Sequence, residues 1–158
     1  MNVLAINSGS SSLKFKVIEF DESPRAAARF TASSRYEGFI EDIGPAAKMM
    51  LRSAGKPVVQ TTGTVLTHTE AVQCMMQRLE ESSKLEGRDL RVDAVGHRVV
   101  HGGEQFREPV MIDDDVMAAI DRLAEFAPLH IPGSMAGIKG ARAALASHIP
   151  MVAVFDTA

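Results

Sequence analysis

Several residue types are scarce in this sequence of 158 residues, which contains no tryptophan, one tyrosine and one cysteine, Cys74. A single cysteine excludes an internal disulfide bond and is typical of proteins from a reducing compartment. No apolar run reaches the ~20 residues that a membrane-spanning helix needs. The first residues also lack the basic segment and the apolar segment of a secretory signal. These absences predict a cytoplasmic protein that does not enter a membrane.

An excess of positive charge is also lacking, since 17 lysines and arginines face 20 aspartates and glutamates. Proteins that bind nucleic acid usually carry a basic patch together with aromatic side chains for stacking. Because the net charge is −3 and aromatic residues make up 5% of the chain, nucleic acid is not an expected partner. The length suits one domain with a substantial core.

Hydrophobic patterning predicts strands at the start of the chain. Residues 2–6 form a short apolar run, and residues 13–20 alternate between apolar and charged side chains. These patterns predict a buried strand and a half-buried strand. A weaker strand is expected within 25–34, whereas the glycines and prolines of 35–64 are compatible with short strands and turns and predict no definite element.

Helices and strands alternate in the rest of the chain. Apolar residues at helical spacing, a capping threonine and acidic residues in a first turn indicate helices. Expected helices cover 67–83, 113–127 and 135–148, expected strands lie in 91–103 and 150–156, and a loop with two prolines is expected at 127–134. Strands followed by alternating helices and strands predict an α/β fold, a mixed sheet with helices packed on it.

The serine-rich turn NSGSSSLK (7–14) joins the first two strands, although a tight hairpin needs only two turn residues. It is no Walker A loop, because a strand and not a helix follows. Gly9 allows a ligand to approach the main chain, successive N–H groups can form a nest for phosphate, and Ser10, Ser12 and Lys14 add donors and charge. From the loop alone, a phosphate-binding turn and a solvated hairpin turn remain about equally good interpretations.

The stretch AVGHRVVHGG (94–103) places His97 and His101 four residues apart. Its valines and glycines favour a strand, on which residues four apart are separated by ~13 Å, too far to share a metal ion. A zinc pair is therefore excluded. Arg98, beside the glycine pair, could bind a carboxylate or phosphate through two parallel hydrogen bonds, or it could form a surface salt bridge.

Two further polar residues are candidates for the site, Asp156 at the end of an apolar segment and His130 in a segment flanked by prolines. Asp156 is the last residue of a predicted strand, where it could hold Mg²⁺ through water, orient a nucleophile or cap the next element. His130 lies in the predicted loop, where a histidine is more often a surface or packing residue. An anion-binding turn, an arginine, a histidine and a strand-end aspartate together suit phosphoryl transfer, which depends on charge neutralisation and positioning.

Two long motifs resemble signatures of the acetate kinase family, and two shorter ones follow at the family's spacing. The motifs are LAINSGSSSLKF (4–15), AVGHRVVHGGEQF (94–106), LAEFAPLHIPGSMAGI (123–138) and VAVFDTA (152–158). The resemblance implies a ribonuclease-H-like, actin-type ATPase lobe, in which helices flank a five-stranded mixed sheet. It also implies a homodimeric enzyme that transfers the γ-phosphoryl group of ATP reversibly to acetate with Mg²⁺, giving ADP and acetyl phosphate.

The matched motifs imply a role for each candidate residue. The implied roles are catalysis for Asn7, Arg98, His130 and Asp156, substrate binding for Arg98, Val100 and Leu129, phosphate binding for Ser10, Ser12 and Lys14, and Mg²⁺ binding for Asn7 and Asp156. Val100 and Leu129 would form the apolar pocket for the acetate methyl group. On this interpretation the serine-rich turn faces a transferring phosphate.

The sequence departs from the family pattern in two respects. Ile131 and Ser134 stand where the family usually has asparagine. Family members run to about 400 residues, the length of two lobes of ordinary domain size. Residues 1–158 are therefore expected to form the N-terminal lobe, without the C-terminal nucleotide-binding lobe, and to be inactive alone. Propionate or butyrate could replace acetate, since one methylene changes pocket binding by only ~1–3 kcal/mol, and a non-catalytic module that binds phosphate or carboxylate also stays open.

Overall fold

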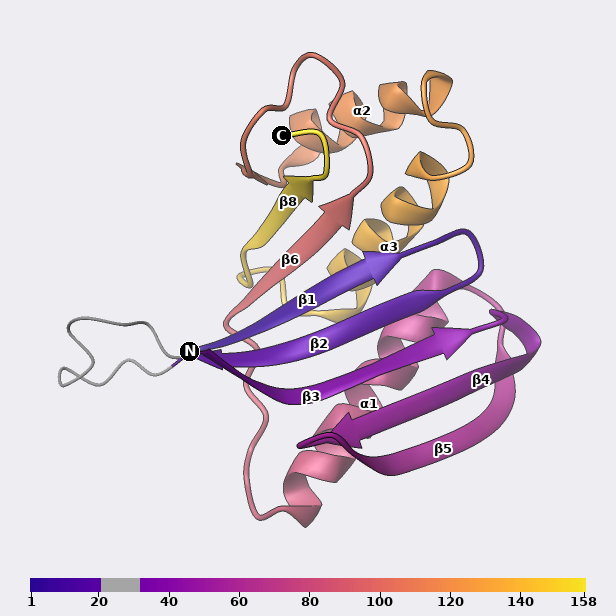
Figure 1. The fold of residues 1–158 in the computed structure, drawn as a ribbon, viewed down its shortest axis with the longest axis vertical. Coiled ribbons are helices and arrows are strands. Elements are labelled where there is room, and N and C mark those ends of the chain that lie inside the picture. The colour runs from indigo at the N-terminus through magenta and orange to yellow at the C-terminus, as the bar shows by residue number, and fades with distance from the viewer. Residues whose placement is uncertain (21–31) are drawn as a thin grey trace, which may run out of the picture.

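The computed structural model describes residues 1–20 and 32–158, which form one mixed sheet with flanking helices (Figure 1). The strands are β1 (Asn2–Ser8), β2 (Leu13–Phe20), β3 (Ala32–Glu41), β4 (Gly44–Ser53), β5 (Lys56–Val65), β6 (Ala94–Val99), β7 (Val110–Met111) and β8 (Met151–Phe155). They are arranged in the order β5-β4-β3-β2-β1-β6-β8-β7. The helices are α1 (His68–Leu85), α2 (Asp114–Arg122) and α3 (Ile131–Ala144), and a short 3₁₀ turn, η2, covers Leu123–Glu125.

The described residues form eight strands rather than the expected five, while the α/β class and the mixed sheet with flanking helices are confirmed. Most of the additional strands lie in 35–64, where β3, β4 and β5 pair as antiparallel neighbours. Register shifts interrupt the β4–β5 pairing and most of β5 is exposed, so a period of two is not visible there. Of the strand expected within 25–34, residues 25–31 lie outside the described residues, and β3 begins at Ala32.

The directions of the strands decide where a site can form. β1 pairs parallel with β6, and β6 pairs parallel with β8, whereas β1 and β2 are antiparallel. The carboxyl ends of β1, β6 and β8 therefore meet at one edge of the sheet (Figure 1). Ligands of open α/β sheets bind beyond such ends.

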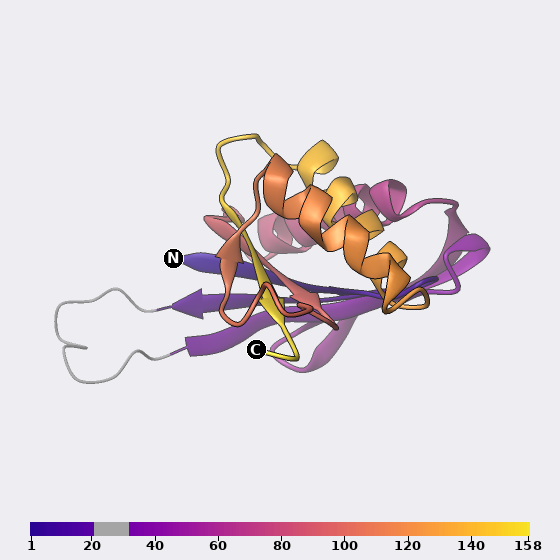
Figure 2. The same cartoon turned by 90° about the horizontal axis from the view of Figure 1, so that it is seen from above.

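The helices lie on one face of the sheet, and the opposite face is left open (Figure 2). Successive side chains of a strand point to opposite faces. Leu4 and Ile6 are buried beneath the helices, and Asn7 belongs to the open face together with Lys14 and Arg98. The buried side chains form two clusters, one between α1 and the strands β1 to β5, the other between α2, α3, β6 and β8.

The helix predicted at 67–83 is confirmed as α1, whose capping residue Thr67 accepts a hydrogen bond from the Glu70 N–H at 3.1 Å. α3 begins at Ile131, earlier than predicted, so the loop expected at 127–134 is wrong in its second half. A proline in the first turn of a helix loses no hydrogen bond, because the N–H groups there have no partner within the helix. The proline that suggested a loop thus marks the start of a helix.

The remaining predicted elements are found with small changes in length. The helix expected at 113–127 divides into α2 and η2. The strands expected in 91–103 and 150–156 are confirmed as β6 and β8. Across residues 1–20 and 32–158, no helix is both long and apolar enough to span a membrane.

Candidate active site at the ends of β1, β6 and β8

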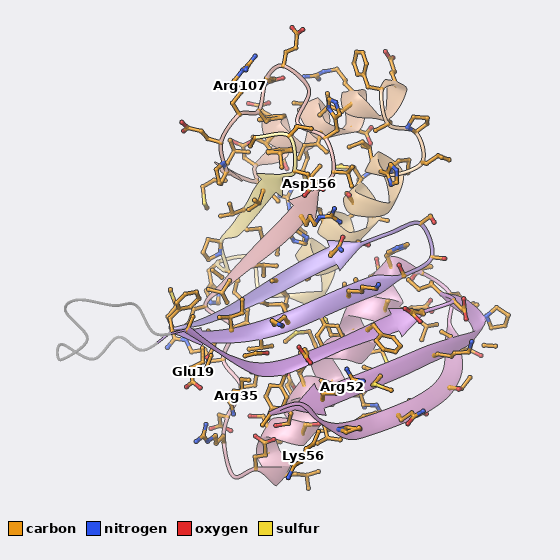
Figure 3. The ribbon with its side chains drawn as sticks, in the orientation of Figure 1. Glu19, Arg35, Arg52, Lys56, Arg107 and Asp156 are labelled. Carbon is orange, nitrogen blue, oxygen red and sulfur yellow. The ribbon has the colours of Figure 1, made fainter. Side chains whose placement is uncertain are left out.

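Three of the predicted site residues meet at these strand ends. Asn7 and Arg98 are register partners on β1 and β6, and Asp156 directly follows β8 (Figure 3). Arg98 Nη1 donates a hydrogen bond to Asn7 Oδ1 at 3.2 Å. Arg98 Nε and Nη2 donate to the two carboxylate oxygens of Asp156, at 2.9 and 2.5 Å. One guanidinium thus joins side chains that lie 91 and 58 residues away in sequence.

The ion pair between Arg98 and Asp156 is partly exposed, with 48% and 37% of the two side chains accessible to solvent. Exposed ion pairs contribute only ~0–1 kcal/mol to stability. Two parallel hydrogen bonds nevertheless fix the plane of the guanidinium. The salt bridge left open by the sequence is therefore present, whereas the binding of a carboxylate or phosphate by Arg98 stays a prediction.

Contacts with three other segments of the fold surround the serine-rich turn between β1 and β2. Within the turn, the Gly9 N–H donates to the Ser12 carbonyl at 2.8 Å. The Ile43 N–H, from the connection between β3 and β4, donates to the Ser11 carbonyl at 2.9 Å. The imidazole Nε2 of His68, on α1, lies 2.8 Å from the Gly9 carbonyl oxygen. The turn is thus built into the fold rather than only solvated.

Two glycines allow α3, the third of these segments, to lie directly against the turn. A Cβ atom at Gly133 would lie 2.5 Å from the Gly9 carbonyl carbon, and one at Gly137 would lie 2.5 Å from the Ser8 Cβ. A side chain at either position would push the helix away, so the close approach requires glycine. Neither residue was predicted to belong to the site. The signal that could have found them is their spacing of four, which places both on one face of a helix.

A hollow of about 200 Å³ opens between the turn and the strand ends. Its lining residues are Asn7, Ser8, Gly9, Ser12, Lys14, Arg98, Val100 and His130. Most of the predicted site residues are thus brought together, including His130 from the start of α3. Three do not line the hollow. Ser10 is exposed, Leu129 is 78% exposed to solvent, and Asp156 is joined to the site through its hydrogen bonds with Arg98.

A wider hollow of about 390 Å³ lies on the open face and shares Asn7, Lys14 and Arg98 with the first. Lys16 also lines it and forms an ion pair of 3.3 Å with Glu37. Within the part of the chain that the structure describes, Lys14 forms no ion pair. The positive side chains of Lys14 and Arg98 lie next to the main-chain N–H groups and hydroxyls of the serine-rich turn. Together they make this edge of the sheet attractive to an anion.

Oxygen donors for a divalent cation are present at Asn7 and Asp156. Mg²⁺ commonly binds through one or two carboxylates, with substrate phosphates and water as its other ligands. One carboxylate and one amide oxygen beside a phosphate-sized hollow fit this pattern, although both accept hydrogen bonds from Arg98. Within the described ranges, no group of three or more His, Cys, Asp or Glu side chains could hold a metal ion. Substrate phosphates and water would therefore have to supply the other ligands.

His97 lies next to Arg98 in sequence but on the covered face of the sheet. Its side chain is 2% exposed, and burial lowers its pKa from 6.5 to about 4. Its Nε2 has no hydrogen-bond partner among the described residues. His97 is therefore neutral at pH 7, and its side chain is buried, although the residue also borders the wider hollow beside Arg98. His101 instead accepts a hydrogen bond from the Gly103 N–H at 2.8 Å through Nδ1.

Known proteins match this chain over nearly all of its residues. A model of the acetokinase family matches residues 2–158. An acetate kinase of Oceanobacillus iheyensis is 41% identical over 158 residues, which cover 99% of this chain and 37% of the relative. The crystal structure of Porphyromonas gingivalis acetate kinase has a TM-score of 0.83 at 32% identity, over 99% of this chain and 37% of that one. A propionate kinase structure from Francisella tularensis has a TM-score of 0.77 at 30% identity, over 98% and 36%.

The chain spans 37% of the length of that curated relative. The structural match confirms the expected actin-type ATPase lobe. The family model matches all but the first residue, so membership of one family explains both the fold and the motifs at the strand ends. The chain belongs to the acetokinase family.

Proposed function

We propose that residues 1–158 form the N-terminal lobe of an enzyme that transfers the γ-phosphoryl group of ATP to a short carboxylic acid, with acetate as the acceptor. The observation that carries the proposal is the convergence of Asn7, Arg98 and Asp156 beside the serine-rich turn. A new P–O bond to the carboxylate would form while the bond to ADP breaks, giving acetyl phosphate. Relatives and structural neighbours named acetate kinase support this assignment.

Charge neutralisation and positioning are the main requirements of this reaction. Arg98 offers N–H groups in a planar fork that suits carboxylate and phosphate oxygens. Lys14 supplies a second cation in the same hollow. The main-chain N–H groups of the turn and the hydroxyls of Ser10 and Ser12 would bind phosphate oxygens. Asn7 would contact the transferred group through its amide.

Mg²⁺, when bound, would neutralise charge on the phosphates, with Asn7 and Asp156 as its oxygen donors from this lobe. Val100 lines the hollow and offers apolar surface to the acetate methyl group. Leu129 would have to turn toward Val100 to share this role, since it is 78% exposed. His130 lines the hollow and would donate a hydrogen bond to the bound anion.

The two residues that depart from the family pattern lie in the first turn of α3. Ile131 is fully buried and Ser134 is 3% exposed. Neither lines the hollow between the turn and the strand ends. Their substitution would therefore change how α3 packs rather than how the acceptor is held, so acetate remains the proposed acceptor.

A second acceptor and a second class of function each have some support. The neighbour named propionate kinase is 30% identical to this chain. One methylene changes binding in an apolar pocket by only ~1–3 kcal/mol, so propionate, or butyrate, would need only a slightly larger pocket. A non-catalytic module that binds phosphate or carboxylate would use the same donors without turnover.

The complete enzyme in this proposal has a second lobe, which binds the adenosine part of ATP, and is a homodimer. The coverage of 37% of the curated relative supports the assignment of this chain to one lobe. Residues 1–158 alone would bind anions but not turn over ATP.

The test is acyl-phosphate formation from MgATP by the protein expressed from the complete reading frame, with acetate, propionate and butyrate as acceptors. Arg98→Lys keeps the charge but removes the planar fork, and should lower kcat/KM by roughly 100-fold or more. Arg52→Lys is the matched control, since Arg52 lies on β4, away from Asp156 (Figure 3). If propionate is turned over in preference to acetate, propionate replaces acetate as the proposed acceptor. If no acid is turned over, the non-catalytic binding module is favoured.

A further inference from the structure

His68, the first residue of α1, contacts the serine-rich turn from the side of the helices. Its Nε2 lies 2.8 Å from the Gly9 carbonyl oxygen, 59 residues away in sequence. Thr67 caps the helix immediately before it. A Cβ atom at Gly140 of α3 would lie 3.0 Å from the His68 carbonyl oxygen, so α3 packs closely on this residue. Both helices therefore fix the position of His68 beside the turn.

The contact defines where the imidazole carries its hydrogen. A carbonyl oxygen only accepts hydrogen bonds, so Nε2 of His68 is the donor. The neutral Nε2–H tautomer and the imidazolium ion both meet this requirement.

The same contact sets the direction of the next main-chain donor. A trans peptide group is planar, and its C=O and N–H point in opposite directions. Because the Gly9 carbonyl is directed at His68, the Ser10 N–H points away from α1. It finds no main-chain acceptor within residues 1–20 and 32–158. This N–H group, on an exposed residue that follows Gly9 of the hollow, is therefore available to a ligand.

Gly133 of α3 restricts rotation of this peptide group. The position of a Cβ atom on Gly133 lies 2.5 Å from the Gly9 carbon, 2.7 Å from the Gly9 oxygen and 2.8 Å from the Ser10 nitrogen. Nearly equal distances to three atoms of one plane mean that Gly133 covers the flat face of the peptide. A turn of that plane would bring its atoms against the helix, so His68 and Gly133 together hold one orientation.

We propose that His68 is a positioning residue of the turn, which directs the Ser10 N–H at a phosphate oxygen by holding the Gly9 carbonyl. This inference rests on the proposed function, because it takes the turn to bind phosphate. His68 itself does not touch the ligand. Its contribution is a donor oriented before the ligand arrives, which needs no reorganisation on binding.

The test follows binding of inorganic phosphate by NMR spectroscopy of the ¹⁵N-labelled chain. His68→Gln keeps a side-chain N–H donor, His68→Leu removes it at similar size, and His148→Leu makes the matched change at an exposed histidine. Phosphate should shift the Ser10 amide resonance in the wild type, in His68→Gln and in His148→Leu. In His68→Leu the dissociation constant should rise by about tenfold or more, the effect of one hydrogen bond to a charged group.

A second readout needs no ligand. The Gly9 amide, which donates to the Ser12 carbonyl, should exchange its hydrogen faster in His68→Leu than in His68→Gln. If His68→Leu does not fold, His68→Asn replaces it, because its amide is one methylene too short to reach Gly9 and should show the same losses.

Several results would overturn the positioning role. Wild-type phosphate affinity in His68→Leu would do so. Equal losses in His68→Gln and His68→Leu would also do so, because the loss would then follow the ring rather than the donor. Absence of any phosphate response in the wild type would contradict phosphate binding by the turn itself, and the inference would fall with that part of the proposed function.

Discussion

The carboxylate of Asp156 occupies two of the donors of Arg98, Nε and Nη2, that a substrate anion would use. Nη1 is bonded to Asn7 at the same time. A ligand carboxylate or phosphate must therefore compete with Asp156 or use the remaining N–H groups of the guanidinium. The pair keeps Arg98 oriented before a ligand arrives, and it also weakens the attraction of Arg98 for an anion.

Asp156→Asn should strengthen the binding of acetate and of inorganic phosphate to the chain. The change removes a negative charge beside Arg98, and a unit charge at ~4 Å in water is worth ~1 kcal/mol, about fivefold in affinity. Calorimetric titration at two salt concentrations measures the gain, which should shrink as salt screens the charge. Asp115→Asn, on the exposed side of α2, is the control with the same change of charge. Weaker binding by Asp156→Asn would mean that the carboxylate itself helps to hold the ligand.

Gly133→Ala should destabilise the fold, although alanine is favoured over glycine within a helix by ~1 kcal/mol. The new methyl group would lie 2.5 Å from the Gly9 main chain, which cannot move aside like a flexible side chain. We expect a net loss of about 1–3 kcal/mol in the free energy of unfolding, the usual cost of overpacking. Urea unfolding measures it, with Gly63→Ala as control, since nothing lies within 4 Å of a Cβ atom at Gly63. Equal stability of Gly133→Ala and the wild type would show that α3 can move away from the turn.

Burial of His97, which lowers its pKa from 6.5 to about 4, should make the fold sensitive to acid. Between these two values the unfolded chain binds a proton at His97 that the folded chain does not. The free energy of unfolding should therefore fall as the pH falls through this window. The full loss is roughly 3 kcal/mol, at ~1.4 kcal/mol for each pKa unit. Urea unfolding at several pH values between 7 and 4 measures the slope.

Two variants test whether His97 causes this dependence of the free energy of unfolding on pH. His97→Leu should flatten the profile over the window, whereas His148→Leu should keep the slope of the wild type. Glu86 adds a separate loss only below its usual pKa of 4.5, because hydrogen bonds from Ser53 and Tyr36 lower its pKa in the folded state. An unchanged slope in His97→Leu would assign the acid sensitivity to other groups.

Tyr36 should ionise at unusually high pH. It is fully buried and its hydroxyl donates to Glu86 Oε2 at 2.8 Å. Burial first, and then this hydrogen bond and the Glu86 charge, raise the pKa of Tyr36 above 10.0. Because Tyr36 is the one tyrosine and tryptophan is absent, an ultraviolet absorbance titration observes it directly. Glu86→Gln should lower the midpoint, and a wild-type midpoint at or below 10.0 would contradict the contact.

The strands and helices that could be predicted from sequence are those with one buried and one exposed face. β2 alternates buried and exposed side chains over its first five residues, and its prediction is confirmed. β5 is exposed on both faces over most of its length, so its sequence carries no period of two. The start of α3 was missed because proline and glycine near a helix start resemble a loop. Only the contact of Gly133 with the turn explains why glycine is needed there.

The residues of the candidate site also include some that could be predicted from the sequence and one that could not. Asn7, Arg98 and Asp156 could be predicted to lie near one another, because each belongs to the end of an apolar strand and parallel strands end at one edge of a sheet. His68 could not be predicted, since its partner Gly9 lies 59 residues away and no local pattern connects the two. A contact between segments that are distant in the sequence forms only when the chain folds, so the spacing of residues does not predict it.

The parallel pairing of β1 with β6 sets Asn7 opposite Arg98 and Ile6 opposite His97. Because successive strand residues point to opposite faces, a shift of β6 by one residue would exchange the two side chains. The open face would then carry a neutral imidazole, and the core would hold an unpaired guanidinium. The hydrogen bonds between these two strands thus decide which charge a ligand meets. An insertion or deletion in either strand would change the chemistry of the site as much as its shape.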